Sequence, residues 1–419
     1  MKKLLAAVAV VTTASLALSG CSGSSGADSS GKVTLTMWHG YTEADGKVLD
    51  QIIDDFNKSQ DKITINTTTK TWAVIGDTLL PALSAKKGPD IVALPAENLP
   101  VYASKGAFAK LDDFYDSAAT KGASLNPSAV DMEKVEGSYY GVPTGFVPLS
   151  VVYNKALFKE AGITSFPTTW DEWVADAKKL TIDKNNDGTP EQYGLALPDH
   201  ATVGNGVWAS LFYGNDGAIV DGSKSAVDSP ANQETLKFWS DAVRNDKISP
   251  TGLDGVGSDK LFSSGKAAME IGGPWMASVA KENKIDYGIA GIPAGPKGQA
   301  SSAIGISAAV TAQASSDKQA AAEKFFAYFF TKEVATKWSL GSGWPPLRSD
   351  IPASAVSANP VVASLTPLAA TARPLLPGVA NSADVLTAVD EATQKSLTGG
   401  DPAELLKSAS AAVQDSLDK

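Results

Sequence analysis

The stretch YGVPTGFVPLSVVYNK, Tyr140 to Lys155, decides how this chain is divided. Its extended segments are interrupted by Pro143, Gly145 and Pro148. A proline cannot donate to a sheet ladder, so this stretch does not suit one continuous central strand. We predict that the chain crosses between two domains here, with a first hinge at residues 141–151.

The length of the chain agrees with two domains. Its 419 residues exceed the roughly 250 to 300 at which single cores stop growing. The composition, 43% hydrophobic and 20% charged, is ordinary for a globular protein.

Upstream of the hinge, strand and helix patterns alternate. Residues 32–38 alternate apolar and polar side chains, 48–56 have helical spacing, and 62–69 read as a second strand. A helix at 75–86 and a buried strand at 91–94 follow. This order predicts a parallel α/β sheet.

Downstream, the order continues with the capping box of Thr169 and Glu172, which predicts a helix start. Further helices are expected at 234–244, 260–262 and 317–331, strands at 267–271, 287–293 and 303–311, and a last helix begins at Asp401. We predict one lobe from 32–143 with 300–345, and a second from 144–299 with 346–419.

The N-terminus is typical of an export signal at residues 1–20. Lys2 and Lys3 precede an apolar run of about 15 residues, which is shorter than the roughly 20 that span a bilayer, so a permanent anchor helix is the weaker interpretation. The run ends in Leu-Ser-Gly-Cys, which resembles the lipobox of bacterial lipoproteins. That resemblance implies a lipid on Cys21, a flexible tether at 21–31 and a place on the outer face of the cytoplasmic membrane.

Residue counts exclude several function classes. Cys21 is the only cysteine, so the mature fold has no intrachain disulfide, cysteine nucleophile or zinc cluster. The net charge is −10 with three arginines, which argues against nucleic acid or an anionic surface as partner. Only His39 and His200 could serve a catalytic triad. The HExxH, GxSxG and phosphate-loop motifs are absent from the sequence. Acidic side chains on so negative a chain are usually solvated surface groups rather than a glycosidase pair. Catalysis is therefore not expected.

One loop has the spacing of a calcium site. Oxygen-bearing side chains lie at Asp183, Asn185, Asp187, Thr189 and Glu191, with Gly188 at the sixth position. Gly194 stands where the bidentate acid of an EF-hand belongs. Two interpretations stay open: a turn without metal, or a structural calcium site completed by an acid from elsewhere. No cofactor is otherwise expected.

The nine tryptophans are the strongest remaining signal. Trp38, Trp72, Trp275 and Trp344 lie at predicted strand ends or turns, where α/β folds bind ligands. Trp275, in MEIGGPWMAS, follows two glycines and a proline and is predicted in a loop. A sugar ring has an apolar face and a rim of hydroxyls, so it suits an aromatic platform flanked by polar groups. For each tryptophan alone, core packing is an equal alternative.

Taken in order, several stretches carry a family resemblance. They are VTLTMWHGYTEADGKVLDQIIDDFNK, KKGPDIVAL, YGVPTGFVPLSVVYNKALFKEAGI, PTTWDEW, FSSGKAAMEIGGPW and IPAGPKGQ. The chain resembles the extracytoplasmic solute-binding lipoproteins of bacterial ABC importers, in the sugar-binding family that includes maltose-binding protein. The resemblance implies two α/β lobes joined by crossing strands, a ligand between them, closure by a hinge, recognition of the closed form by a permease, no enzymatic activity and a monomeric state.

The resemblance also implies ligand contacts. Trp275 matches the stacking aromatic, Glu97 matches an acid that accepts sugar hydroxyls, and Asn98 stands where maltose-binding protein has arginine. The other expected contacts are Trp208, Trp72, Phe146, the first strand-end loop with Trp38, His39, Tyr41 and Glu43, and the last crossover with Trp344 and Arg348.

Four of these residues have a structural alternative. His39 could be hydrogen-bonded within its own lobe, Glu43 could face a helix dipole, Arg348 could form an interlobe salt bridge, and Phe146 could pack in the hinge.

The sequence therefore predicts a lipid-anchored receptor that delivers a carbohydrate, of two or more rings, to an ABC permease. A peptide or polyamine is the alternative ligand. A cell-surface glycoside hydrolase is the alternative from another class of protein.

Overall fold

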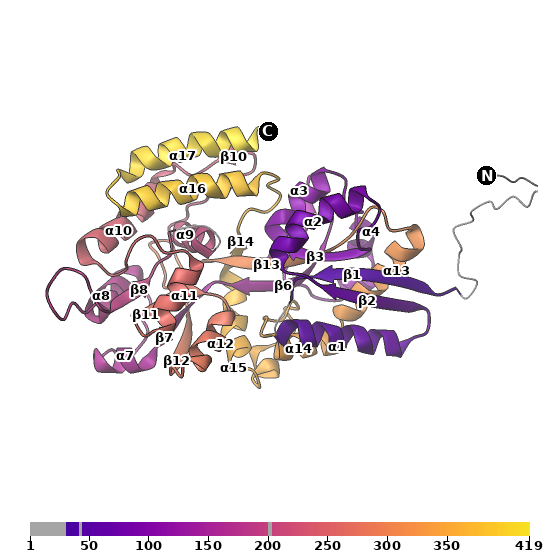
Figure 1. Ribbon diagram of the computed structural model, residues 1–419, viewed down its shortest axis with the longest axis horizontal. Coiled ribbons are helices and arrows are strands. Elements are labelled where there is room, and N and C mark those ends of the chain that lie inside the picture. The colour runs from indigo at the N-terminus through magenta and orange to yellow at the C-terminus, as the bar shows by residue number, and fades with distance from the viewer. Residues whose placement is uncertain (1–30, 42–43, 200–202) are drawn as a thin grey trace, which may run out of the picture.

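The structure, a computed structural model, describes residues 31–41, 44–199 and 203–419. These residues form two α/β lobes that lie side by side, each with its own sheet (Figure 1). The predicted two-lobe α/β fold is confirmed.

The first lobe surrounds a sheet in the order β14-β13-β3-β1-β2, with β6 also paired to β13. Its strands are β1 (Val33–His39), β2 (Ile63–Thr69), β3 (Ile91–Pro95), β6 (Val142–Pro148), β13 (Ser301–Val310) and β14 (Ala372–Pro374). β1 runs parallel to β2 and β3, as the strand-helix-strand pattern predicts, whereas β13 runs antiparallel to β3 and β6. The main helices are α1 (Ala44–Ser59), α2 (Trp72–Ser84), α13 (Ser316–Phe329) and α14 (Lys332–Ser342).

The second lobe surrounds a sheet in the order β12-β7-β11-β8. Its strands are β7 (Ser150–Asn154), β8 (Tyr193–Ala196), β11 (Ala267–Gly272) and β12 (Tyr287–Gly291). Its helices are α7 (Lys155–Glu160), α8 (Trp170–Leu180), α9 (Val203–Gly214), α10 (Pro230–Asp246), α11 (Gly255–Ser263), α12 (Trp275–Glu282), α16 (Ser382–Leu397) and α17 (Pro402–Leu417). As predicted, Thr169 caps α8 by accepting from the Glu172 N–H, and Asp401 caps α17 by accepting from the Glu404 N–H.

Smaller elements complete the chain. They are η1 (Ala96–Asn98), α3 (Leu99–Ser104), α4 (Asp112–Asp116), α5 (Ala118–Lys121), α6 (Pro127–Asp131), β4 (Lys134–Val135), β5 (Ser138–Tyr139), β9 (Val220–Asp221), β10 (Lys224–Ser225), η2 (Ala353–Val356), α15 (Pro360–Leu365) and η3 (Thr366–Thr371). None of the helices in the described ranges is long and apolar enough to cross a membrane.

The first crossing lies where the sequence predicts it. β6 belongs to the first sheet and β7 to the second, and the chain changes sheets at Leu149. β6 pairs only with β13, so it is an edge strand and tolerates Pro143 and Pro148. The Leu149 N–H donates to Ser302 O at 2.9 Å, which ties the first crossing to the start of β13.

The segment before α16 packs against both lobes. Ile351, Val356 and Val362 pack against Ala335 of α14, and β14 pairs with β13. The sequence prediction placed residues 346–419 in the second lobe. α15 of this segment also contacts β12 of the second lobe. The finer lobe boundaries stay a prediction.

Candidate functional site

Trp275 begins a helix rather than lying in a loop. β11 ends at Gly272 and α12 starts at Trp275, so the predicted loop consists of Gly273 and Pro274 alone. The Trp275 indole lies over Gly273, where a Cβ would overlap the ring. A side chain at position 273 would therefore force the half-buried ring to move.

Trp275 lines a cleft of about 530 Å³ to which both lobes contribute. Figure 1 shows α12 of the second lobe near α1, α14 and α15 along the lower edge of the molecule. The cleft is lined by Asp45, Pro274, Trp275, Ala277, Val279, Glu282, Gly341, Ser342, Gly343, Trp344, Asn359 and Val361. Trp275 and Trp344 thus reach one cavity from opposite lobes, together with two carboxylates and an amide. Flat aromatic surface with a few polar groups suits a ring that is apolar on its faces and polar at its rim.

Trp344 is held by close packing on the first lobe. It follows Gly343, which ends α14 with a left-handed φ of +85°. Its ring lies on Gly145 of β6, where a Cβ would come within 2.7 Å of the ring carbons. The Tyr41 ring meets it edge-on, with the ring centroids 6.3 Å apart. This packing leaves the indole only half-buried, with part of its surface in the cleft.

Four predicted contacts lie in the protein cores instead. Trp208, Phe146, His39 and Tyr41 are each at most 2% exposed. Trp208 packs in the second-lobe core and its Nε1 donates to Pro198 O at 3.1 Å. In this structure these four buried side chains therefore offer no surface to a ligand. For Phe146 the alternative of hinge packing describes what is seen.

His39 is a fully buried imidazole, and both of its ring nitrogens are shielded from solvent. Its Nε2 lies 3.8 Å from an Asp50 carboxylate oxygen. Burial lowers the pKa of His39, and the nearby Asp50 charge opposes this shift. A backbone contact with Tyr41 of the same lobe also opposes it, and a hydrogen bond of His39 within its own lobe stays a prediction.

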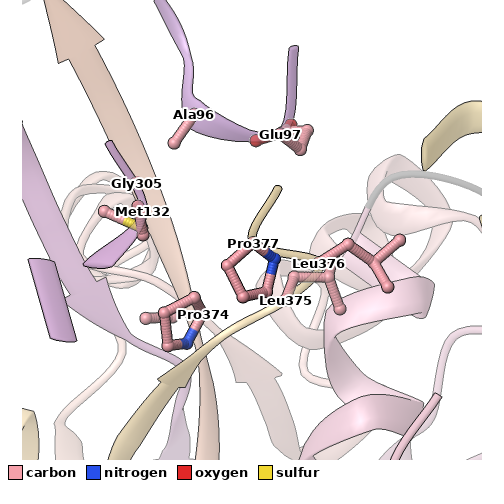
Figure 2. Close-up of a pocket in the computed structure, with 9 residues that line it drawn as sticks. Ala96, Glu97, Met132, Gly305, Pro374, Leu375, Leu376 and Pro377 are labelled. Carbon is pink, nitrogen blue, oxygen red and sulfur yellow. The ribbon is translucent and has the colours of Figure 1, made fainter. Parts of the chain in front are cut away.

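Glu97 lies in a different cavity from Trp275. Figure 2 shows Glu97 on the turn after β3, across from the segment Pro374–Pro377. This cavity measures about 20 Å³, which is room for about one water molecule and not for a sugar ring. Burial raises the pKa of Glu97, and Ser382 Oγ at the start of α16 donates to Glu97 O at 3.0 Å. The next residue, Asn98, is half-buried at the end of the same turn.

The other predicted contacts are placed by local partners. Trp72 is half-buried on Gly40, and Trp38 packs on a first-lobe core with Lys70 Nζ 4.3 Å above its ring. Arg348 donates two 2.8 Å hydrogen bonds to Asp350 and one to Phe330 O, so it closes its own turn rather than bridging the lobes. Glu43 lies outside the described residues.

Sequence reasoning missed four polar residues of the cleft, which are Asp45, Glu282, Ser342 and Asn359. Asp45 lies in the first turn of α1, two residues beyond the loop that the sequence singled out. Glu282 is seven residues after Trp275 and therefore lies on the same face of α12. Because Trp275 is predicted in a loop, this helical spacing is not used to predict Glu282. Asn359 caps α15 and carried no signal.

The candidate calcium loop is closed by its own hydrogen bonds. Asp183, Asn185, Asp187 and Glu191 each accept from a loop N–H at 2.8 Å, and Gly188 has the left-handed φ of +86°. One oxygen of Asp183 is buried and has no hydrogen-bond partner among the residues that the structure describes. Within the described ranges, no cluster of three or more His, Cys, Asp or Glu side chains is placed to hold a metal ion. Calcium binding stays a prediction.

Two α/β lobes on separate sheets, joined by crossing segments and enclosing an aromatic cleft, define the class of solute-binding proteins. The chain belongs to the bacterial extracellular solute-binding protein family, whose model matches residues 51–364.

Relatives and solved structures support this assignment. The chain is 30% identical over 299 residues to the diacetylchitobiose binding protein of Streptomyces coelicolor, covering 67% of this chain and 65% of the relative. It is 28% identical over 327 residues to a maltooligosaccharide ABC transporter solute-binding lipoprotein of Streptococcus pneumoniae, covering 72% and 70%. The crystal structure of the cyclic alpha-maltosyl-1,6-maltose binding protein from Arthrobacter globiformis shares the fold, with a TM-score of 0.81, 24% identity and coverage of 92% and 99%.

Proposed function

We propose that this protein is an extracytoplasmic receptor that binds a carbohydrate and delivers it to an ABC permease. The observation that carries the proposal is the shared cleft in which Trp275 and Trp344 face one ligand space from opposite lobes. A sugar held between them would favour the closed arrangement of the lobes, because it would contact both only when they are close. The sugar-binding names of the relatives support this ligand class.

The ligand is proposed to be a di- or oligosaccharide. A cleft of about 530 Å³ is in the range that encloses ligands larger than a single small ring. Two indoles can also serve successive rings. Asp45, Glu282 and Asn359 would accept or donate at the hydroxyl rim.

A polyamine is the alternative ligand, because the cleft lining combines two carboxylates with two indoles, which together can bind a cation. The relatives favour a sugar over it. Binding of a cation would weaken strongly with salt, whereas stacking of a neutral sugar would not. We propose that the protein is not an enzyme, in keeping with its family of binding proteins.

The N-terminal features complete the proposal. Removal of residues 1–20 and lipid on Cys21 would leave the folded body on a short tether at 21–31, outside the cytoplasmic membrane and within reach of the permease. One relative is named as a lipoprotein of an ABC transporter, which supports this placement. The receptor is proposed to act as a monomer.

No cofactor is proposed for ligand binding, and calcium in the loop from Asp183 to Glu191 is proposed only as a structural ion. Calcium should then raise the melting temperature of the wild-type protein and leave the Asp183→Asn variant unmoved. Equal melting curves with calcium and with a chelator would reject the ion.

A thermal-shift panel tests the function. Mono-, di- and oligosaccharides, peptides and polyamines are each added to the protein at increasing concentration. A ligand at 100 times its Kd adds about 2.7 kcal/mol to stability, which is a clear shift in melting temperature. We expect one class of sugar to produce it. A shift with polyamines alone, lost in high salt, would replace the sugar proposal.

A further inference from the structure

Tyr41 is a buried residue surrounded by the rings of Trp72, Trp338 and Trp344. Its ring centroid is 5.2 Å from Trp72, 5.2 Å from Trp338 and 6.3 Å from Trp344, and each contact is edge-to-face. The side chain is 2% exposed, so it does not touch a ligand. It does touch Trp344, which lines the cleft.

The Tyr41 hydroxyl is fixed to the crossing strands. It lies 2.8 Å from Thr144 Oγ1 of β6, and Thr144 Oγ1 donates to Ile306 O of β13 at 3.2 Å. Because threonine has one hydroxyl hydrogen and gives it to the carbonyl, the hydrogen between the two hydroxyls comes from Tyr41. Burial raises the pKa of Tyr41, so the phenol keeps the proton that this bond requires.

The geometry points to Tyr41 as a positioning residue for ligand binding: its hydrogen bond to Thr144 fixes the ring that holds the Trp344 platform in place. This inference rests on the proposed function of the cleft. Trp344 has Gly145 beneath it and the edge of Tyr41 beside it. If the Tyr41 ring is free to tilt, the indole gains freedom that it must lose again when a ligand binds, and affinity falls.

Two substitutions at this bond have different expected effects. Tyr41→Phe removes the donor and leaves Thr144 bonded to Ile306, so the sugar Kd should rise about fivefold. Thr144→Val leaves a buried hydroxyl on Tyr41 without a partner, so the Kd should rise about tenfold or more. The double variant should resemble Tyr41→Phe, because it removes the orphaned hydroxyl. A matched control is Tyr102→Phe, a buried tyrosine of the same lobe whose hydroxyl donates to Gly76 O at 3.1 Å.

The experiment combines calorimetric titration with fluorine NMR of protein labelled with 5-fluorotryptophan. The Trp344 resonance is assigned by its loss in Trp344→Phe. In the ligand-free protein we expect this resonance to shift or broaden in Tyr41→Phe and Thr144→Val and to stay in place in Tyr102→Phe. Purely structural damage would not single out this resonance.

The outcomes separate the two proposals. If the wild-type protein binds no sugar, the proposed function fails, while the ligand-free Trp344 resonance still tests the positioning role. If sugar binds but neither variant changes the resonance or the affinity, Tyr41 does not position the platform. Equal changes in Tyr102→Phe would also overturn the inference, because they would show a general loss of stability.

Discussion

Gly145→Ala should push the Trp344 platform out of place. An alanine Cβ at this position would lie 2.7 Å from the Trp344 ring carbons. Ordinary contacts begin at 3.4 Å, so the shortfall, 3.4 minus 2.7, is about 0.7 Å. The ring cannot retreat freely because the Tyr41 ring packs against it.

The expected cost is that of overpacking, about 1 to 3 kcal/mol. Alanine gains about 0.5 to 1 kcal/mol over glycine in a strand, so the midpoints of the two ranges leave a net loss of about 1 kcal/mol of unfolding free energy. Because the indole is displaced toward the cleft, sugar affinity should also fall about tenfold, which is 1.4 kcal/mol. Urea denaturation measures the first effect and calorimetric titration the second.

Gly76→Ala is the matched control. Gly76 lies within α2, and a Cβ there would meet nothing within 4 Å. That variant should be more stable than wild type by up to about 1 kcal/mol and bind sugar equally well. If Gly145→Ala is as stable as wild type and binds with unchanged affinity, the packing described for Trp344 is wrong.

Three further substitutions test other parts of the account. Burial, with Asp259 close by, raises the pKa of Glu270 to about 10 from 4.5. The unfolded chain therefore loses the Glu270 proton at a lower pH than the folded protein does, so the free energy of unfolding should fall as pH rises from about 4.5 toward 10. Glu270→Gln should reduce this dependence of the unfolding free energy on pH, as measured by urea denaturation at pH 5, 7 and 9. Asp401→Ala removes the cap on the Glu404 N–H and should lower the unfolding free energy by about 1 kcal/mol, measured in the same assay. Cys21→Ser should move the receptor from the membrane to the soluble fraction, and retention at the membrane would argue against the lipid anchor.

Much of the fold is predictable because its signals are local. The alternation in β1, the helical spacing in α1 and the caps at Thr169 and Asp401 depend on residues within a few positions of each other. The crossing at β6 is also local, since its prolines mark an edge strand whatever the partner strand is.

The site is less predictable because burial is decided by distant partners. The Tyr41 hydroxyl is bonded to Thr144, which is 103 residues away, and the side chain is buried instead of lining the cleft. Trp344 lines the cleft because Gly145, which has no side chain, leaves room for its ring. Trp208 matches a family aromatic by its motif, yet its helix turns the indole toward Pro198 and the core. Tryptophan richness therefore indicates a ligand cleft without showing which rings line it.

Calorimetric titration of the sugar found in the panel into Trp275→Ala and Trp344→Ala is the decisive test of whether a sugar binds between the two indoles. Trp38→Ala is the control, because this half-buried indole lies on a first-lobe core outside the cleft. Each cleft variant should weaken binding at least tenfold, about 1.4 kcal/mol, and the control should bind as wild type does. If both cleft variants bind the sugar as tightly as wild type, the ligand is not held between these two tryptophans.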